Sequence, residues 1–280
     1  MTDMPGRIAA AFKAACQDEL EAPKPGNVHV FADGHRMSAG EFMRSAEAAA
    51  GPLTAPGARV GARILAAVEA TAAAVGINTN LGIILLCAPL AAAAERAPCD
   101  LRGALADILD GLDVEDADLA FRAIALAAPG GLGRVERHDV HAPATVSLRE
   151  AMAAAADRDR IARQYVTAFA DVFAVGEAAL AAARTRGLPK EWAVLAVFLA
   201  FLSAFPDSHI ARKRGAATAE EVCRTAREVQ SQLQAAEEPA HLLAAILDWD
   251  RALKQQGINP GTSADLTVAT LFASHLAVGG

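Results

Sequence analysis

The residues of this chain that could bind a charged ligand gather in the breaks between its alanine-rich stretches. The first break, "EAPKPGNVHV" at residues 21–30, sets Lys24 between two prolines and follows it with Gly26, Asn27 and His29. Proline fixes its own φ and pushes the preceding residue out of the helical region, so Lys24 lies on a stiff, extended segment. We expect Lys24 to lie at the surface and to grip phosphate in a fixed place, and Gly26 to let the backbone approach the ligand.

Three further breaks carry the same residue types: "GINTNLG" at 76–82, "FPDSHIARKRG" at 205–215 and "GINPGTSADL" at 257–266. The candidate binding residues in them are Asn78, Thr79, Asn80 and Gly82; Asp207, His209, Arg212, Lys213 and Arg214; and Asn259, Gly261, Ser263 and Asp265. Amides and carboxylates are poor helix formers, so their recurrence at helix ends needs a reason. Taken singly, these breaks are explained by helix caps and by cations at a helix end, whereas together they favour a shared site.

The chemistry of these breaks suits a polyphosphorylated nucleotide. Helices that begin after "GIN" and "NPG" offer free N–H groups and the positive end of the helix dipole to phosphate. Lys24, Arg212 and Lys213 would neutralise the remaining phosphate charge. Asp207 and Asp265 are the candidates for catalysis and for binding Mg²⁺, because a carboxylate accepts a proton or holds a hard cation.

The elements that must position these residues are helices. Alanine makes up roughly a quarter of the 280 residues, only one Tyr and two Trp occur, and runs of alternating β-branched residues are missing. Helical periodicity predicts helices at 6–21, 38–51, 57–76, 80–95, 101–110, 115–128, 147–156, 158–186, 190–205, 216–236, 239–256 and 263–277. We therefore predict an all-α fold: one compact domain over 1–280, with an internal loop break near 129–146 between two closely packed halves.

Charge and hydropathy exclude several classes of protein. The formal charge of −7 argues against a nucleic-acid binder, because phosphate backbones demand a basic surface. The apolar stretches "LGIILLCAPLAAAA" and "WAVLAVFLAFLSAF" each run about 14 residues, short of the roughly 20 that cross a bilayer, so we predict core helices and no membrane partner. The four cysteines have no CxxC spacing, and the first residues do not form a signal peptide; we expect a cytoplasmic protein.

The four segments resemble, in order and spacing, motifs of the triphosphoribosyl-dephospho-coenzyme-A synthase family, and the resemblance runs from about residue 16 to 276. The matching letters are Lys24-Pro25-Gly26, then Asn78, Thr79 and Gly82, then Asp207 and Arg212, and last Gly261, Ser263, Ala264 and Asp265. The resemblance implies an all-helical transferase that uses ATP. Such enzymes move its triphosphoribosyl group to the 2′-hydroxyl of 3′-dephospho-coenzyme A and release adenine. The family reaction passes through an oxocarbenium-like state and needs a carboxylate, with Mg²⁺ and cations on the triphosphate.

Three departures from the better-known members indicate a short branch of the family, as in methanogens and methylotrophs. Their Gly-Ala-Arg-Gly-Glu-Ala segment has no counterpart in this chain. Asn27, Val28 and His29 stand where those members have a Leu-Val-Asp run, and Asn80 and Leu81 stand where they have His-Lys. Two alternatives stay open: a related nucleotide-dependent transferase with another acceptor, for example in C1-carrier coenzyme biosynthesis, and a non-enzymatic helical nucleotide-binding protein. The partners expected are a nucleotide and a coenzyme-like acceptor; a homodimer is one oligomeric state that the sequence leaves open.

Overall fold

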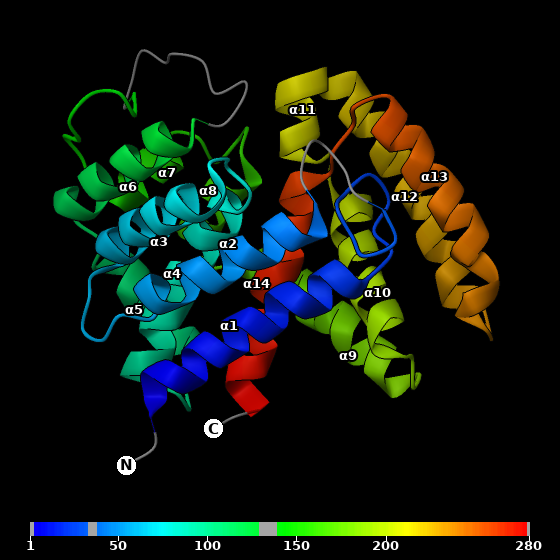
Figure 1. Cartoon of the computed structure of the whole chain (residues 1–280), viewed down its shortest axis with the longest axis horizontal. Coiled ribbons are helices and arrows are strands. Elements are labelled where there is room, and N and C mark those ends of the chain that lie inside the picture. Colours follow the sequence, from blue (N-terminus) through cyan, green and yellow to red (C-terminus); the bar gives the residue numbers. More distant parts are fainter. Residues whose placement is uncertain (1–2, 33–37, 129–138, 279–280) are drawn as a thin grey trace. The chain divides into compact units, whose positions relative to one another are not determined.

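Fourteen α-helices, one π-helix (η1) and one 3₁₀-helix (η2) make up the computed structural model over its described residues, 3–32, 38–128 and 139–278 (Figure 1). In chain order they are α1 (Met4–Glu21), α2 (Ala39–Leu53), α3 (Val60–Val75), α4 (Leu81–Arg96), α5 (Leu101–Asp110), α6 (Val114–Ala127), α7 (Leu148–Ala153), α8 (Arg160–Thr167), η1 (Val172–Gly176), α9 (Glu177–Thr185), α10 (Lys190–Ala204), α11 (Ser208–Arg214), α12 (Ala216–Ala235), η2 (Pro239–Leu242), α13 (Leu243–Gln255) and α14 (Gly261–Val278). No strand occurs in these ranges, so the all-α prediction is confirmed.

The chain divides into two compact units, each assembled from separate stretches of sequence. Unit 1 comprises Met1–Cys16, Gly40–Phe169 and Leu271–Gly280, and unit 2 comprises Gln17–Ala39 and Ala170–Thr270. The predicted loop break at 129–146 falls within the sequence of unit 1, and its residues 129–138 lie outside the described residues. A single domain stays a prediction.

In unit 1, α3 packs closely against α6. A Cβ atom on Gly61 would lie 2.7 Å from the Cα of Asp116, so only glycine allows this approach. The N–H of Gly61 also donates to Asp116 Oδ1 at 2.8 Å. Helix α4 is buried along nearly its whole length, and the Tyr165 hydroxyl of α8 donates to the Leu85 carbonyl at 2.6 Å. The apolar stretch "LGIILLCAPLAAAA" is therefore the core helix that the sequence predicts.

In unit 2, α10 packs against α9, η1 and α12 (Figure 1). Trp192, Phe198 and Leu202 of α10 belong to one buried apolar cluster. The cluster also takes in residues of α11, α12, α13, the loop before α14 and α14 itself, among them Ile210, Val222, Ile246, Leu253, Ile258 and Ala264. This core holds α11, α13 and the start of α14 in place, and these are the elements that carry most of the candidate residues.

Two predicted elements are wrong. The single helix predicted over 158–186 is α8, η1 and α9, because Ala168 and Phe169 adopt left-handed conformations with φ of 49° and 61°. The predicted loop at 205–215 contains α11, a seven-residue helix capped by Asp207. A short helix carries too few apolar repeats for its period to be recognised.

No single helix in the three described ranges is long and apolar enough to cross a membrane. Three sharply bent helix pairs reach the necessary length and composition, namely 81–96 with 101–110, 160–167 with 172–185, and 190–204 with 208–214.

Candidate functional site

Three of the four predicted segments meet in unit 2, around the loop that leads into α14. Asn27 of the first segment donates from Nδ2 to Asn259 Oδ1 at 2.9 Å. Asp207 of the third segment accepts hydrogen bonds from Ser263, the third residue of α14. We call residues 24–29, 207–214 and 257–265 the loop cluster. The segments are distant in sequence, so only the fold brings them together.

Asp207 caps α11 and joins that helix to α14. Its Oδ1 accepts from the N–H groups of His209 at 2.9 Å and Ile210 at 3.1 Å. Its Oδ2 accepts from the N–H and the hydroxyl of Ser263, both at 2.8 Å. The side chain is fully buried, and burial raises the pKa of Asp207 although the four donors act in the opposite direction. Because these donors occupy both oxygens, the geometry does not support the predicted roles of Asp207 in catalysis and in Mg²⁺ binding.

Further contacts pack the start of α11 against the start of α14. The hydroxyls of Ser208 and Thr262 lie 2.9 Å apart, and the His209 N–H donates to Thr262 Oγ1 at 3.2 Å. A Cβ atom on Gly261 would lie 3.0 Å from His209 Nδ1, which is tighter than ordinary packing. Gly261 and Ser263 thus have structural reasons to be present. Ligand contacts by Gly261, Ser263 and His209 stay predictions.

Lys24 is fully buried, so the expected surface position is wrong. Its Nζ donates to the carbonyls of Glu19 at 2.7 Å and Val28 at 2.9 Å, and lies 3.2 Å from Glu19 Oε1. Burial lowers the pKa of Lys24 and raises that of Glu19, which is buried as well. All three N–H donors of the ammonium group have protein partners. On this stiff segment, Lys24 therefore links Glu19 of α1 to Val28 inside the protein, and it is not placed to bind phosphate at the surface.

Asp250 on α13 is a site residue that the sequence analysis missed. Its Oδ1 accepts the Gly26 N–H at 2.8 Å, and its Oδ2 lies 3.3 Å from His29 Nε2 and 3.0 Å from Lys254 Nζ. Burial raises the pKa of Asp250, but hydrogen bonds from His29, Lys254 and Gly26 outweigh it and hold the pKa below its ordinary value. Burial lowers the pKa of His29, which favours its neutral form, and a neutral ring with its proton on Nε2 would donate to Asp250 across the 3.3 Å between them.

A sequence signal for Asp250 does exist. The buried residues of α13 are Ile246, Asp250 and Leu253, which follow helical spacing along one face. A carboxylate in an apolar stripe is buried when its helix packs, and a buried carboxylate is almost always paired.

Gly26 brings the first segment against the loop before α14. Its φ is +78°, and a Cβ atom there would lie 2.9 Å from Pro260 Cδ and 3.1 Å from the Ile258 carbonyl oxygen. The close approach that we expected toward a ligand is therefore made toward the chain itself. It sets the neighbouring Asn27, which is buried, against the half-buried Asn259.

The basic residues of the loop cluster lie at the end of α11. Arg214 donates from Nε to the Gly257 carbonyl at 3.1 Å, which ties this helix to the loop before α14. Lys213 is exposed, and its pKa is lowered by partial burial and by the neighbouring Arg212 and Arg214. Phosphate binding by Arg212 and Lys213 stays a prediction. Asp265, in the second turn of α14, is half-buried, and its catalytic role likewise stays a prediction.

The fourth segment begins α4 in unit 1. Asn78 accepts the Leu81 N–H at 3.2 Å, and Thr79 donates to the Ser45 hydroxyl at 2.6 Å. Asn80 precedes α4 and is buried, but its side chain does not cap the helix, and its Nδ2 has no hydrogen-bond partner within the described part of the chain. Buried donors are normally paired. Asn80 is therefore the residue of this segment with an unused donor; contacts from Asn78, Thr79 and Gly82 to a nucleotide stay predictions.

A magnesium site built by the protein does not fit these residues. Across the described ranges, no group of three or more His, Cys, Asp or Glu side chains could hold a metal ion. Mg²⁺ binds carboxylate oxygens, and those of Asp207 are already taken by hydrogen bonds. Magnesium stays a prediction.

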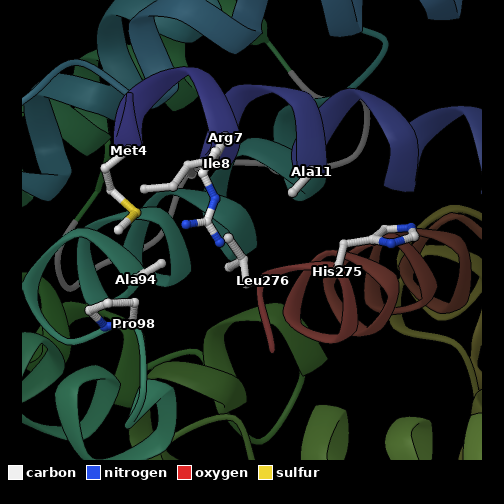
Figure 2. A pocket seen from close by; sticks show the side chains of 8 residues that line it. All are labelled: Met4, Arg7, Ile8, Ala11, Ala94, Pro98, His275 and Leu276. Atoms are coloured by element: carbon white, nitrogen blue, oxygen red, sulfur yellow. The ribbon is translucent and has the colours of Figure 1, made fainter. Parts of the chain in front are cut away.

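A pocket in unit 1 does not coincide with any candidate residue. Figure 2 shows its lining side chains: Met4, Arg7, Ile8, Ala11, Ala94, Pro98, His275 and Leu276. Its volume is about 50 Å³, far below the several hundred Å³ of a typical ligand site. We therefore do not assign the function to this pocket.

Comparisons with known proteins support the motif assignment. The family model of ATP:dephospho-CoA triphosphoribosyl transferase matches residues 5–280. A crystal structure of a candidate triphosphoribosyl-dephospho-coA synthase from Archaeoglobus fulgidus is 25% identical and covers 84% of this chain and 96% of its own, with a TM-score of 0.64. No curated protein matches the chain.

Proposed function

Because the chain belongs to the ATP:dephospho-CoA triphosphoribosyl transferase family, we propose that it moves the 5-triphosphoribosyl group of ATP to the 2′-hydroxyl of 3′-dephospho-coenzyme A and releases adenine. The structural observation that supports this proposal is the loop cluster. Three segments selected from sequence for nucleotide binding come together in unit 2, through hydrogen bonds between Asn27 and Asn259 and between Asp207 and Ser263.

The reaction exchanges one bond at C1′ of the ATP ribose for another. The bond from C1′ to adenine N9 breaks and its electron pair stays on adenine, which takes up a proton; the bond from C1′ to the acceptor 2′-oxygen forms, and the hydroxyl proton passes to a base. Asp265 is our candidate for that base and for stabilising the positive charge that develops on the ribose. Asp207 is a poorer candidate, because its carboxylate is fully buried and accepts four hydrogen bonds.

The triphosphate carries most of the negative charge of the donor substrate. Lys213 is exposed at the end of α11, and the preceding Arg212 is half-buried. The first N–H groups of α14 have no partners inside their own helix; Asp207 accepts that of Ser263, so those of Gly261 and Thr262 are the ones suited to phosphate oxygens. Magnesium would enter with the nucleotide phosphates, since Mg²⁺ is commonly held by substrate phosphates and few protein ligands.

The test is release of adenine, followed by chromatography, from ATP and magnesium with and without dephospho-coenzyme A. Adenine that appears only with this acceptor supports the proposal. Nucleotide binding by calorimetry without adenine release would indicate another acceptor, an alternative that Asn80, standing where other members have His, favours. A protein that neither binds nucleotide nor releases adenine would refute both the proposed function and the alternative with another acceptor. Asp265→Asn should abolish release, and Asp248→Asn, a change at an exposed aspartate of α13, is the matched control.

A further inference from the structure

Unit 2 contains a cluster of charged and titratable residues, buried except for the half-buried Lys254, that the proposed chemistry does not use. Its members are Glu19, Lys24, His29, Asp250 and Lys254. Lys24 pairs with Glu19 at 3.2 Å and Lys254 pairs with Asp250 at 3.0 Å, so the charges balance when His29 is neutral. Buried ion pairs are often no more stabilising than apolar residues of similar volume, because desolvation offsets their attraction. Stability alone is therefore a weak explanation for this cluster.

The cluster fixes the backbone beside Asn27. The Gly26 N–H donates to Asp250, and Gly26 has a left-handed φ of +78° that few residues share. Lys24 lies buried under the same turn and donates hydrogen bonds to the carbonyls of Glu19 and Val28 on either side of it. Asp250 lies on α13, and the loop after that helix carries Asn259. One carboxylate on a helix thus sets Asn27 opposite Asn259.

We propose that Asp250 is a positioning residue that holds the turn at 24–29, so that the amides of Asn27 and Asn259 bind a neutral polar group of the substrate. This inference rests on the proposed function. The bond from Asn27 Nδ2 to Asn259 Oδ1 leaves Asn27 Oδ1 to accept and Asn259 Nδ2 to donate. The cluster that holds this turn carries no net charge when His29 is neutral, so the pair suits a sugar hydroxyl or a base edge better than a phosphate, which needs positive charge.

The test is a double-mutant cycle on kcat/KM for ATP with Asp250→Asn, Asn27→Ala and the two combined. Since small displacements of positioning groups cost up to about a hundredfold, we expect each single change to lower kcat/KM by at least about tenfold. If Asp250 acts through Asn27, the combined variant should be no worse than Asn27→Ala by more than about threefold. A merely structural role predicts losses that multiply, and that result would overturn the proposal.

A second variant tests whether a loss of activity in Asp250→Asn comes from misfolding. Asp250→Asn leaves Lys254 without its counter-charge, so Asp250→Asn combined with Lys254→Met, which restores the balance, is measured in the same cycle. Hydrogen exchange at the Gly26 amide should be faster in both variants, because that amide exchanges a charged carboxylate acceptor for the weaker, neutral carbonyl oxygen of asparagine. Wild-type kcat/KM in a folded Asp250→Asn, Lys254→Met variant would contradict the positioning role.

Failure of the proposed function gives a different pattern. If the wild-type protein binds ATP but releases no adenine with dephospho-coenzyme A, the same cycle is measured on ATP affinity by calorimetry. Non-additive losses there would support the positioning role although the acceptor is wrong. Additive losses in a protein that does release adenine would refute the positioning role alone. A wild-type protein that binds no nucleotide would refute both.

Discussion

Replacing Asp207 by alanine should strongly destabilise unit 2. The change removes the cap of α11, which costs about 0.5–2 kcal/mol in comparable helices. It also leaves the fully buried N–H of Ser263 without its acceptor at 2.8 Å, and an unsatisfied buried donor costs about 1–3 kcal/mol. We therefore expect the free energy of unfolding to fall by about 1.5–5 kcal/mol.

Urea denaturation followed by circular dichroism measures this loss. The matched control is Asp248→Ala, which removes an exposed aspartate from α13 and should change stability by less than about 0.5 kcal/mol. Asp207→Asn should fall between alanine and wild type. Its carbonyl oxygen still accepts from α11, but its NH₂ group faces the two donors of Ser263. An Asp207→Ala protein with wild-type stability and no activity would refute the structural role and restore the catalytic one.

Three further predictions follow from the loop cluster. Lys24→Met should lower the free energy of unfolding by about 3–5 kcal/mol, because Glu19 is left buried without its counter-charge. Adding Glu19→Gln should recover part of this loss. An unchanged melting temperature for Lys24→Met would contradict the buried ion pair. Gly26→Ala should cost at least about 1 kcal/mol in thermal unfolding, because alanine is strained at a φ of +78° and would contact Pro260; a more stable variant would show that the turn can relax. Asp265→Asn should abolish adenine release and leave the metal-free melting temperature unchanged. If the variant instead keeps full activity and its free energy of unfolding falls by about 0.3–1 kcal/mol, Asp265 acts only as a negative charge near the start of α14.

Local patterns predicted most of the helices correctly. Helix α5 begins and ends where periodicity places it, at residues 101 and 110. The apolar stretches in α4 and α10 are buried, as their length indicates. The single helix predicted over 158–186 was wrong at the junction of α8 and η1, because neither Ala168 nor Phe169 is a residue type that favours the left-handed conformation it adopts.

The candidate site was predicted in part. The sequence selected the segments around Asn27, Asp207 and Ser263, and three of the four do meet in one unit. It misjudged Lys24, since the prolines determine the shape of its backbone but not which residues cover it. Asp207 does lie in the loop cluster, but its four donors became visible only once α11 and α14 were placed side by side.

The sequence by itself determined the helical class of this protein and the motifs that match its family, because both depend on composition and on spacing along the chain. Only the tertiary structure decided that Lys24 is buried and that Asp250 holds the Gly26 N–H, a contact between residues 224 positions apart. Helical period and backbone propensity describe each segment separately. Burial, charge pairing and satisfied hydrogen bonds arise from the neighbours that packing supplies, and no local pattern specifies those neighbours.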